Sequence, residues 1–266
     1  MNLSDFAGKA VFVAGGSSGI NLGIARAFAT AGASVAIMSR SPERVAGAVA
    51  ELRALAAPGA HIEGFNADVR DADATSAVLA QAHAALGDFD VLVSGAAGNF
   101  VAPALGMSAK GFRTVIDIDL NGTFHVLRGA HAFLRKPGAS VISISAPQAY
   151  NPTMYQAHVC AAKAGVDMLT RVLAMEWGPD GIRVNSIVPG PIGDTEGVRR
   201  LAPTPEAQAQ MAATVPLGRM GTTAEIADMA LFLSSCHAQF VTGAVIPVDG
   251  GSSLAGGRNL GAALNT

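Results

Sequence analysis

The stretch VAGGSSGINLG, residues 13 to 23, decides the fold class of this 266-residue chain. It follows the apolar run AVFVAG (10 to 15) and leads into a segment whose apolar residues recur at helical spacing. Gly15 and Gly19 let backbone N–H groups approach a pyrophosphate at a helix start, where the peptide dipoles favour negative charge. A strand, a glycine-rich turn and a helix in this order predict a dinucleotide-binding unit.

Further apolar runs along the chain are expected strands, separated by longer segments of helical period. The expected strands are 10–15, 34–39, 61–67, 89–95, 140–145, 182–188 and 244–248. Runs that are apolar throughout are typical of a parallel sheet buried on both faces. Right-handed crossovers then predict an α/β fold, a single doubly wound parallel sheet of Rossmann type with helices on both faces. Because no linker or change of composition divides the chain, residues 1–266 are interpreted as one domain.

Composition and charge exclude several classes of protein. The formal net charge is −2 and no Lys/Arg block occurs, so we expect small-molecule partners and no nucleic acid. No apolar run reaches the ~18 residues of a membrane span, and the spacing of Cys160 and Cys236 fits no metal site. The N-terminal residues lack a signal-peptide pattern, and Leu264-Asn265-Thr266 differs from the Ser-Lys-Leu peroxisomal address. A cytoplasmic protein is therefore expected.

The ends of the second and third expected strands indicate which dinucleotide is bound. An acidic residue after the second strand would bind the ribose 2′-OH of NAD, whereas an Arg accommodates the 2′-phosphate of NADP. Arg40 stands there, beside Ser39, and predicts NADP(H) as the cofactor. Asp68, after the third strand, has the position to accept a hydrogen bond from the adenine amino group. Its alternative role is to cap the following helix, which Asp71 is equally placed to do.

These residues, together with SGAAGN (94 to 99), NSIVPGPI (185 to 192) and PVDGG (247 to 251), resemble the short-chain dehydrogenase/reductase family over nearly the whole chain. The resemblance implies that Lys163 holds the hydroxyls of the nicotinamide ribose. The glycine turn, the strand ends and the resemblance together predict the following cofactor-binding residues: Gly15, Ser17, Ser18, Gly19, Ile20, Arg40, Asp68, Val69, Ala96, Ala97, Gly98, Lys163, Pro189, Gly190, Ile192 and Thr195.

The usual proton donor of that family is missing. In most members a Tyr four residues before the Lys, together with a Ser, passes a proton to a carbonyl oxygen. The matching positions here are Val159 and Ala146, and neither side chain transfers a proton. Candidate substitutes are Tyr150 and Tyr155, the latter eight residues before Lys163 and so about two helical turns away. Simple ketone reduction by the usual residues is therefore not expected.

A narrower resemblance fits the missing tyrosine. AAGNF (96 to 100), TVIDIDLNGTF (114 to 124) and EWGPDGIRVNSIVPGPIGDTEGVRRL (176 to 201) are similar to the 2,4-dienoyl-CoA reductases, particularly the peroxisomal type, which also lacks the Tyr and has Asp at the position of Asp119. In the mitochondrial type a Tyr occupies the position of Gln148. In the related enoyl-thioester reductases a Tyr seven residues before the Lys falls on Gln156. His158, on the far side of the helix from Lys163, is expected to be structural.

The resemblance implies NADPH-dependent reduction of a conjugated acyl thioester. Negative charge collects on the thioester oxygen, and a carbon atom is then protonated. Hydrogen-bond donors and an ordered water suit these two steps. The implied catalytic residues are Asp119, which orients that water or titrates itself, Lys163, and Asn99, which donates to the thioester oxygen. Residues 190–215 are expected to cover the substrate. The implied acyl-CoA contacts are Arg70, Phe100, Ser108 and Arg200.

Two other functions stay open at this point. The first alternative is an NADP-dependent carbonyl reductase or alcohol dehydrogenase that uses Tyr155 or Tyr150 as its acid. The second is a dinucleotide-binding sensor or scaffold without turnover. Against the second, a protein that only binds has no need of Asn99, Asp119 and Lys163 together. The family resemblance also implies a homotetramer, with the Lys163 helix at one interface.

Overall fold

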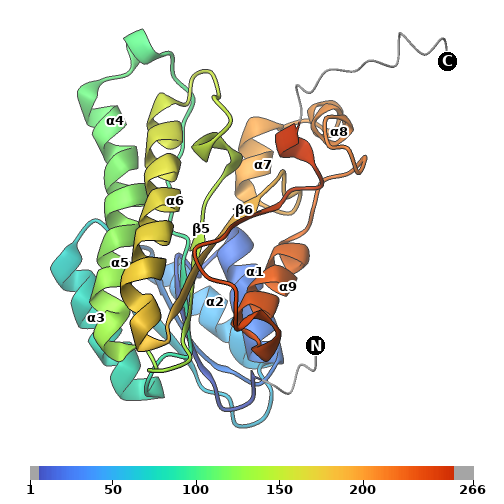
Figure 1. Cartoon of the computed structure of the whole chain (residues 1–266). Coiled ribbons are helices and arrows are strands. Elements are labelled where there is room, and N and C mark those ends of the chain that lie inside the picture. Colours follow the sequence, from blue (N-terminus) through green and yellow to red (C-terminus); the bar gives the residue numbers. More distant parts are fainter. Residues whose placement is uncertain (1–5, 255–266) are drawn as a thin grey trace.

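A parallel sheet forms the centre of the molecule in the computed structural model, which describes residues 6–254 apart from the side chain of Arg200 (Figure 1). Its strands are β1 (Ala10–Ala14), β2 (Ser34–Ser39), β3 (Ile62–Asn66), β4 (Val91–Ser94), β5 (Ser140–Ile144), β6 (Arg183–Pro189) and β7 (Val245–Val248). They lie in the order β3-β2-β1-β4-β5-β6-β7, and every neighbouring pair is parallel. The expected doubly wound fold is confirmed.

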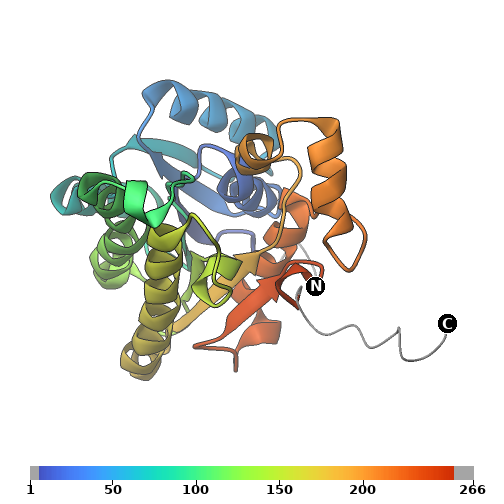
Figure 2. The ribbon, with the colours of Figure 1, turned by 90° about the horizontal axis from the view of Figure 1, so that it is seen from above.

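Helices cover both faces of the sheet, as Figure 2 shows from above. One layer holds α1 (Gly19–Thr30), α2 (Pro42–Leu55) and α9 (Thr223–Ser234). The other holds α3 (Ala72–Leu86), α5 (Gly122–Ala130) and α6 (Ala157–Trp177), with α4 (Ala109–Ile116) joined to α5 by a π-helical turn, Asp117–Asn121. Two short helices, α7 (Glu196–Leu201) and α8 (Pro205–Ala213), follow β6.

The alternation of side chains along β1 shows why both layers are needed. Val11 and Val13 pack in the cluster that contains α1, α2 and α9, whereas Phe12 packs in the opposite cluster with α3, α5 and α6. All three are fully buried. Among the described helices, none is both long and apolar enough to cross a bilayer.

The order of the strands determines where a ligand site lies. From β1 the chain moves outward to β2 and β3, and then returns to place β4 on the other side of β1. The connections after β1 and β4 therefore diverge, which leaves a crevice at the carboxyl ends of these strands. The glycine-rich turn after β1 and the segment after β4 line this crevice.

Candidate active site

Two adjoining cavities at the carboxyl edge of the sheet form one continuous cleft. The smaller, about 280 Å³, lies toward β2, and the larger, about 500 Å³, lies between β4, β5, β6 and α7. Ser18, Asn21, Gly95, Ala97 and Glu196 line both cavities. With the exception of Asp68, every residue predicted to bind the cofactor lines one of the two.

The glycine-rich turn leaves room for a pyrophosphate. Gly15 and Gly19 have φ angles of +80° and +56°, in the region that favours glycine. A Cβ on Gly15 would lie 2.8 Å from the backbone nitrogen of Ala96, so the close approach of this turn to the segment after β4 requires glycine at residue 15. The N-terminus of α1 follows directly, and its free N–H groups suit the phosphates of a dinucleotide.

Asn21 has a role that the sequence did not indicate. Its side chain is buried, and its Nδ2 donates to the carbonyl oxygen of Gly95 at 2.7 Å, which ties α1 to the end of β4. A Cβ on Gly95 would lie 2.1 Å from Asn21 Oδ1. The position of the Asn21 side chain therefore requires glycine at residue 95, just after β4.

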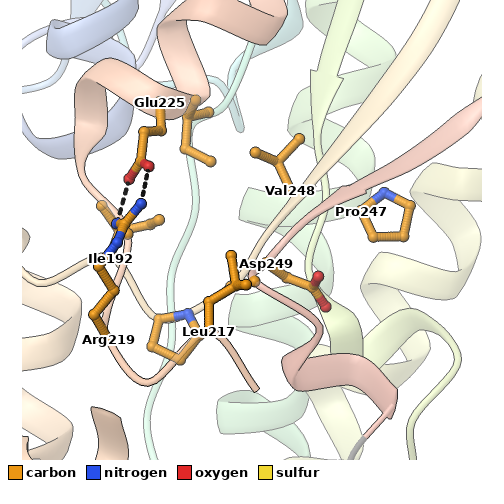
Figure 3. Close-up of a pocket in the computed structure, with 12 residues that line it drawn as sticks. Ile192, Leu217, Arg219, Glu225, Pro247, Val248 and Asp249 are labelled. Atoms are coloured by element: carbon orange, nitrogen blue, oxygen red, sulfur yellow. Dashed lines mark hydrogen bonds and ion pairs between the residues drawn. The ribbon is translucent and has the colours of Figure 1, made fainter. Parts of the chain in front are cut away.

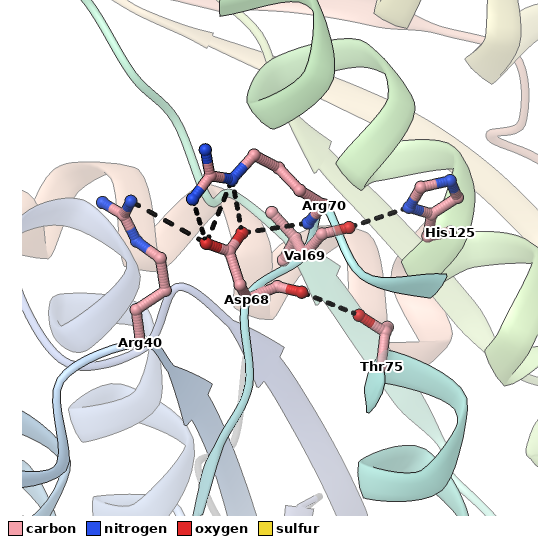
Figure 4. Close-up of polar contacts among 6 residues, drawn as sticks. All are labelled: Arg40, Asp68, Val69, Arg70, Thr75 and His125. Atoms are coloured by element: carbon pink, nitrogen blue, oxygen red, sulfur yellow. Dashed lines mark hydrogen bonds and ion pairs between the residues drawn. The ribbon is translucent and has the colours of Figure 1, made fainter. Parts of the chain in front are cut away.

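A carboxylate between two arginines lies beside the smaller cavity (Figure 4). Asp68 Oδ2 is 2.6 Å from Arg70 Nη2 and 4.0 Å from Arg40 Nη1. The hydrogen bond from Arg70 is the main reason that the pKa of Asp68 lies below its ordinary value. Asp71, not Asp68, caps α3 by accepting from Ala74 N at 2.9 Å. Asp68 is thus left to hold two guanidinium groups at the end where the 2′-phosphate of NADP is expected.

The larger cavity contains a buried ion pair. Asp119, in the π-helical turn, is 1% exposed, and its Oδ2 lies 3.4 Å from Lys163 Nζ. Asp119 Oδ1 accepts from Gly98 N at 2.7 Å, and Lys163 Nζ donates to the carbonyl oxygen of Ile144 at 3.0 Å. Both charges are therefore compensated by hydrogen bonds as well as by each other, which burial requires. The expected proximity of Asp119 and Lys163 is present in the structure.

The groups at the usual tyrosine and serine positions are apolar. Val159 and Ala146 both line the larger cavity. Neither tyrosine compensates for them, because Tyr150 and Tyr155 are 45% and 55% exposed and neither lines the cleft. The expected helical spacing of Tyr155 was wrong: α6 begins only at Ala157, and Tyr155 has a positive φ of 65° in the preceding loop.

Three amide side chains are joined by hydrogen bonds at the larger cavity. Gln156 Nε2 donates to Asn99 Oδ1 at 3.2 Å, and Gln148 Nε2 donates to Gln156 Oε1 at 2.8 Å. Asn99 and Gln148 line the cavity, whereas Gln156 is 4% exposed and lies behind them. The sequence singled out Asn99 but gave no sign that Gln156 bonds to it or that Gln148 bonds to Gln156.

Of the residues predicted to bind acyl-CoA, Arg70, Phe100 and Ser108 do not line the cleft. The ring of Phe100 packs edge-on against buried His158, with centroids 4.3 Å apart. Ser108 caps α4 by accepting from Gly111 N at 3.0 Å. Arg70 is bonded to Asp68, as described above, and the side chain of Arg200 lies outside the described part of the chain. Their contact with a substrate stays a prediction.

The segment after β6 is anchored to α9. Ile192 pairs with Gly221 in an isolated bridge, and Asp194 accepts from Thr223 Oγ1 at 2.7 Å. A third cavity of about 260 Å³ lies behind residues 190–192 (Figure 3). At its side Arg219 pairs with Glu225 and lowers the pKa of that carboxyl to about 2. The cavity includes none of the predicted catalytic residues. Leu201 and Met211, from the expected covering region, line the larger cavity.

A second buried carboxylate lies one helical turn after Lys163. Asp167 is 4% exposed and accepts a hydrogen bond from Ser186 Oγ at 3.2 Å. Burial raises the pKa of Asp167, against the opposing effects of the hydrogen bond from Ser186 and of the charges on Arg171 and Lys163.

Comparisons with known proteins place this arrangement in a family. A family model described as enoyl-(acyl carrier protein) reductase matches residues 14–253. A short-chain dehydrogenase/reductase structure from Mycobacterium ulcerans is 36% identical, with a TM-score of 0.90 over 98% of this chain and 95% of that one. The chain belongs to the short-chain dehydrogenase/reductase family and is an oxidoreductase, and the family implies a nicotinamide cofactor.

Within that family, several relatives of the chain are 2,4-dienoyl-CoA reductases. It is 43% identical to the peroxisomal 2,4-dienoyl-CoA reductase of Rattus norvegicus, over 92% of this chain and 83% of the relative. The peroxisomal enzyme of Arabidopsis thaliana is 42% identical, over 95% and 87% of the two chains. A probable 2,4-dienoyl-CoA reductase of Bacillus subtilis is 39% identical, over 92% and 97%. The resemblance predicted from the motifs is confirmed.

Proposed function

We propose that this enzyme reduces a 2,4-dienoyl-CoA to an enoyl-CoA with NADPH. The observation that carries the proposal is the buried Asp119–Lys163 pair in a cleft where Val159 replaces the usual tyrosine. A ketone reductase needs an acid that protonates oxygen, and the two described tyrosines lie outside the cleft. Reduction of a conjugated thioester needs hydrogen bonds that stabilise the negative charge on the thioester oxygen, and a proton that is delivered to carbon. The relatives named as dienoyl-CoA reductases support the same substrate.

The cofactor proposed is NADPH, held by the residues that line the cleft. Arg40 is 60% exposed beside the smaller cavity, so its guanidinium is accessible to a 2′-phosphate. Lys163, fixed by the Ile144 carbonyl, holds the nicotinamide ribose hydroxyls. When bound, the nicotinamide supplies hydride to the far carbon of the diene.

The protein's own residues then manage charge and protons. Asn99 donates from Nδ2 to the thioester oxygen, which gains negative charge as hydride adds. Asp119, held by Gly98 N and Lys163, orients the water that protonates carbon. Asp117, two residues earlier, accepts a hydrogen bond from Asn121 Nδ2 at 2.9 Å and does not line the cleft. The two carboxylates therefore have separate roles.

Assembly as a homotetramer is proposed from an uncovered apolar face. Met168, Val172 and Met175 of α6 are 57%, 41% and 81% exposed, and Phe124 of α5 is 43% exposed. Such a surface on two adjacent helices suits contact with a second copy. A cytoplasmic location remains a prediction from the sequence alone. The rat and Arabidopsis relatives are named peroxisomal.

The test follows NADPH oxidation with 2,4-hexadienoyl-CoA and, separately, with a panel of ketones. We expect turnover of the dienoyl thioester and little or none of the ketones. Turnover of ketones alone would show the proposal to be wrong. Asp119→Asn is expected to lower kcat strongly, and Tyr155→Phe, an exposed residue, is expected to leave it nearly unchanged. The opposite pair of results would favour the carbonyl-reductase alternative.

A further inference from the structure

The three amides beside the larger cavity come from three separate segments. Asn99 follows β4, Gln148 lies in the loop after β5, and Gln156 directly precedes α6. The hydrogen bonds join them in one direction: Gln148 donates to Gln156, which donates to Asn99. A primary amide offers two donors at nitrogen and an acceptor at oxygen, so the orientation of one amide dictates that of the next.

The direction of this chain decides what the cleft presents to a ligand. Because Asn99 Oδ1 already accepts from Gln156, the group left for a ligand is Nδ2, which has no hydrogen-bond partner within residues 6–254. The reverse orientation would present Oδ1 instead, and an acceptor there repels an oxygen that gains negative charge. Two aligned amides behind Asn99 also strengthen its donation, because chains of hydrogen bonds polarise one another.

Gln156 is not explained by a structural role at the start of α6. It occupies the N-cap position of that helix, yet its side chain makes no capping hydrogen bond. Both its polar atoms are used by the other two amides instead. A buried amide left without partners is unfavourable, so burial at 4% exposure holds Gln156 in this arrangement.

We propose that Gln156 and Gln148 are positioning residues that keep the Asn99 amide turned with Nδ2 toward the substrate. Gln156 acts on Asn99 directly, and Gln148 acts through Gln156. The oxygen site of this enzyme is thereby restricted to groups that accept hydrogen bonds, such as a thioester carbonyl. The inference rests on the proposed function, in which Asn99 binds that oxygen.

The decisive variant is Gln148→Glu. A carboxylate cannot donate a hydrogen bond, so the Gln156 amide must turn its Nε2 toward residue 148 and its Oε1 toward Asn99. The Asn99 amide must then donate from Nδ2 to Gln156, which turns Asn99 Oδ1 into the cleft. Loss of one oxyanion donor lowers kcat by about 10²–10³-fold. We expect a fall of that order, with the KM for NADPH unchanged. Below the pKa of the introduced carboxyl, its protonated form donates again, and kcat should recover.

Two controls separate positioning from other effects. Gln148→Met keeps a similar shape without a charge, and should lose less activity and gain no recovery at acidic pH. In an Asn99→Ala background, Gln148→Glu should have no further effect, because the residue through which it acts is gone. Additive losses in the double variant, or equal pH profiles for the Glu and Met variants, would overturn the proposal.

The measurement does not depend on the dienoyl-CoA assignment. It uses whichever substrate of the panel the unaltered enzyme reduces fastest. Activity on ketones alone would therefore refute the proposed function, and the coupling between residues 148 and 99 would still be measured. Unchanged kcat in Asn99→Ala would refute the positioning role, since Asn99 would then have no task. Side-chain amide exchange of Gln156, followed by NMR in the NADPH complex, gives a readout without substrate: slow exchange supports the chain, and fast exchange contradicts it.

Discussion

One ion pair lies beside the smaller cavity and a second lies inside the larger cavity, and the pair with the shorter distance is expected to contribute less to stability. Arg70 and Asp68 are 2.6 Å apart with side chains 44% and 26% exposed, whereas Lys163 and Asp119 are 3.4 Å apart at 6% and 1% exposure. Water screens the first pair, so its Coulomb attraction is small. The second pair has lost its water, so each charge depends on the other. Burial, more than distance, decides what a contact is worth here.

The largest effect is expected from breaking the buried pair. Lys163→Met leaves the Asp119 carboxylate buried without its cation, which costs about 3–5 kcal/mol of stability. Activity should fall by at least about 10²-fold. Chemical denaturation and NADPH oxidation measure the two effects. In the double variant Lys163→Met/Asp119→Asn most of the stability should return and the activity should not. A single variant as stable as the unaltered protein would contradict the comparison.

A smaller effect is expected at the exposed end, on the cofactor. Arg40→Gln removes one charge-assisted contact, worth about 1.5–3 kcal/mol, and should raise the KM for NADPH by about 10–100-fold. The KM for NADH should stay nearly constant, because NADH has no 2′-phosphate. Arg53→Gln is the matched control, since Arg53 bonds the carbonyl oxygen of Ile62 and does not line the cleft. An equal change for both cofactors would show that Arg40 does not read the 2′-phosphate.

A pH-dependent stability effect is expected at Asp167. Because burial raises its pKa in the folded protein, the stability associated with its neutral form is present at acidic pH and is lost as pH rises through the folded value. Asp167→Asn removes this loss, so the variant should gain Tm relative to the unaltered protein as pH rises, by a few degrees at most. Thermal melts at acidic and neutral pH test this. A difference that is constant with pH would be inconsistent with the raised pKa.

The smallest effect is expected from the exposed pair. Arg70→Gln should change stability by less than about 1 kcal/mol, since surface ion pairs contribute little. The pKa of Asp68, now held low by Arg70, should rise toward its ordinary value of 3.8. Denaturant unfolding and NMR titration measure the two changes. A stability loss as large as that of Lys163→Met would show that burial is not what distinguishes the two pairs.

The sequence predicted the cofactor end more fully than the catalytic end. Gly15, Gly19 and Arg40 were found at strand ends because their positions follow from local patterns. Tyr155 was wrongly predicted to be helical because the spacing of an alanine-rich segment does not show where α6 begins. Tyr155 itself lies in the loop before that helix and has a positive φ. The sequence assigned no role to Asn21, whose position is explained by its hydrogen bond to the carbonyl oxygen of Gly95.

The sequence by itself determined the fold class, the glycine-rich turn after β1 and the absence of the usual tyrosine, because each of these is recorded in consecutive residues with known periodicity or backbone chemistry. Tertiary structure decided which polar groups meet. Asp119 and Lys163 come from different helical segments, and Asn99, Gln148 and Gln156 from three connections of the sheet. Parallel strands bring such distant segments to one edge, and burial there makes their hydrogen bonds obligatory.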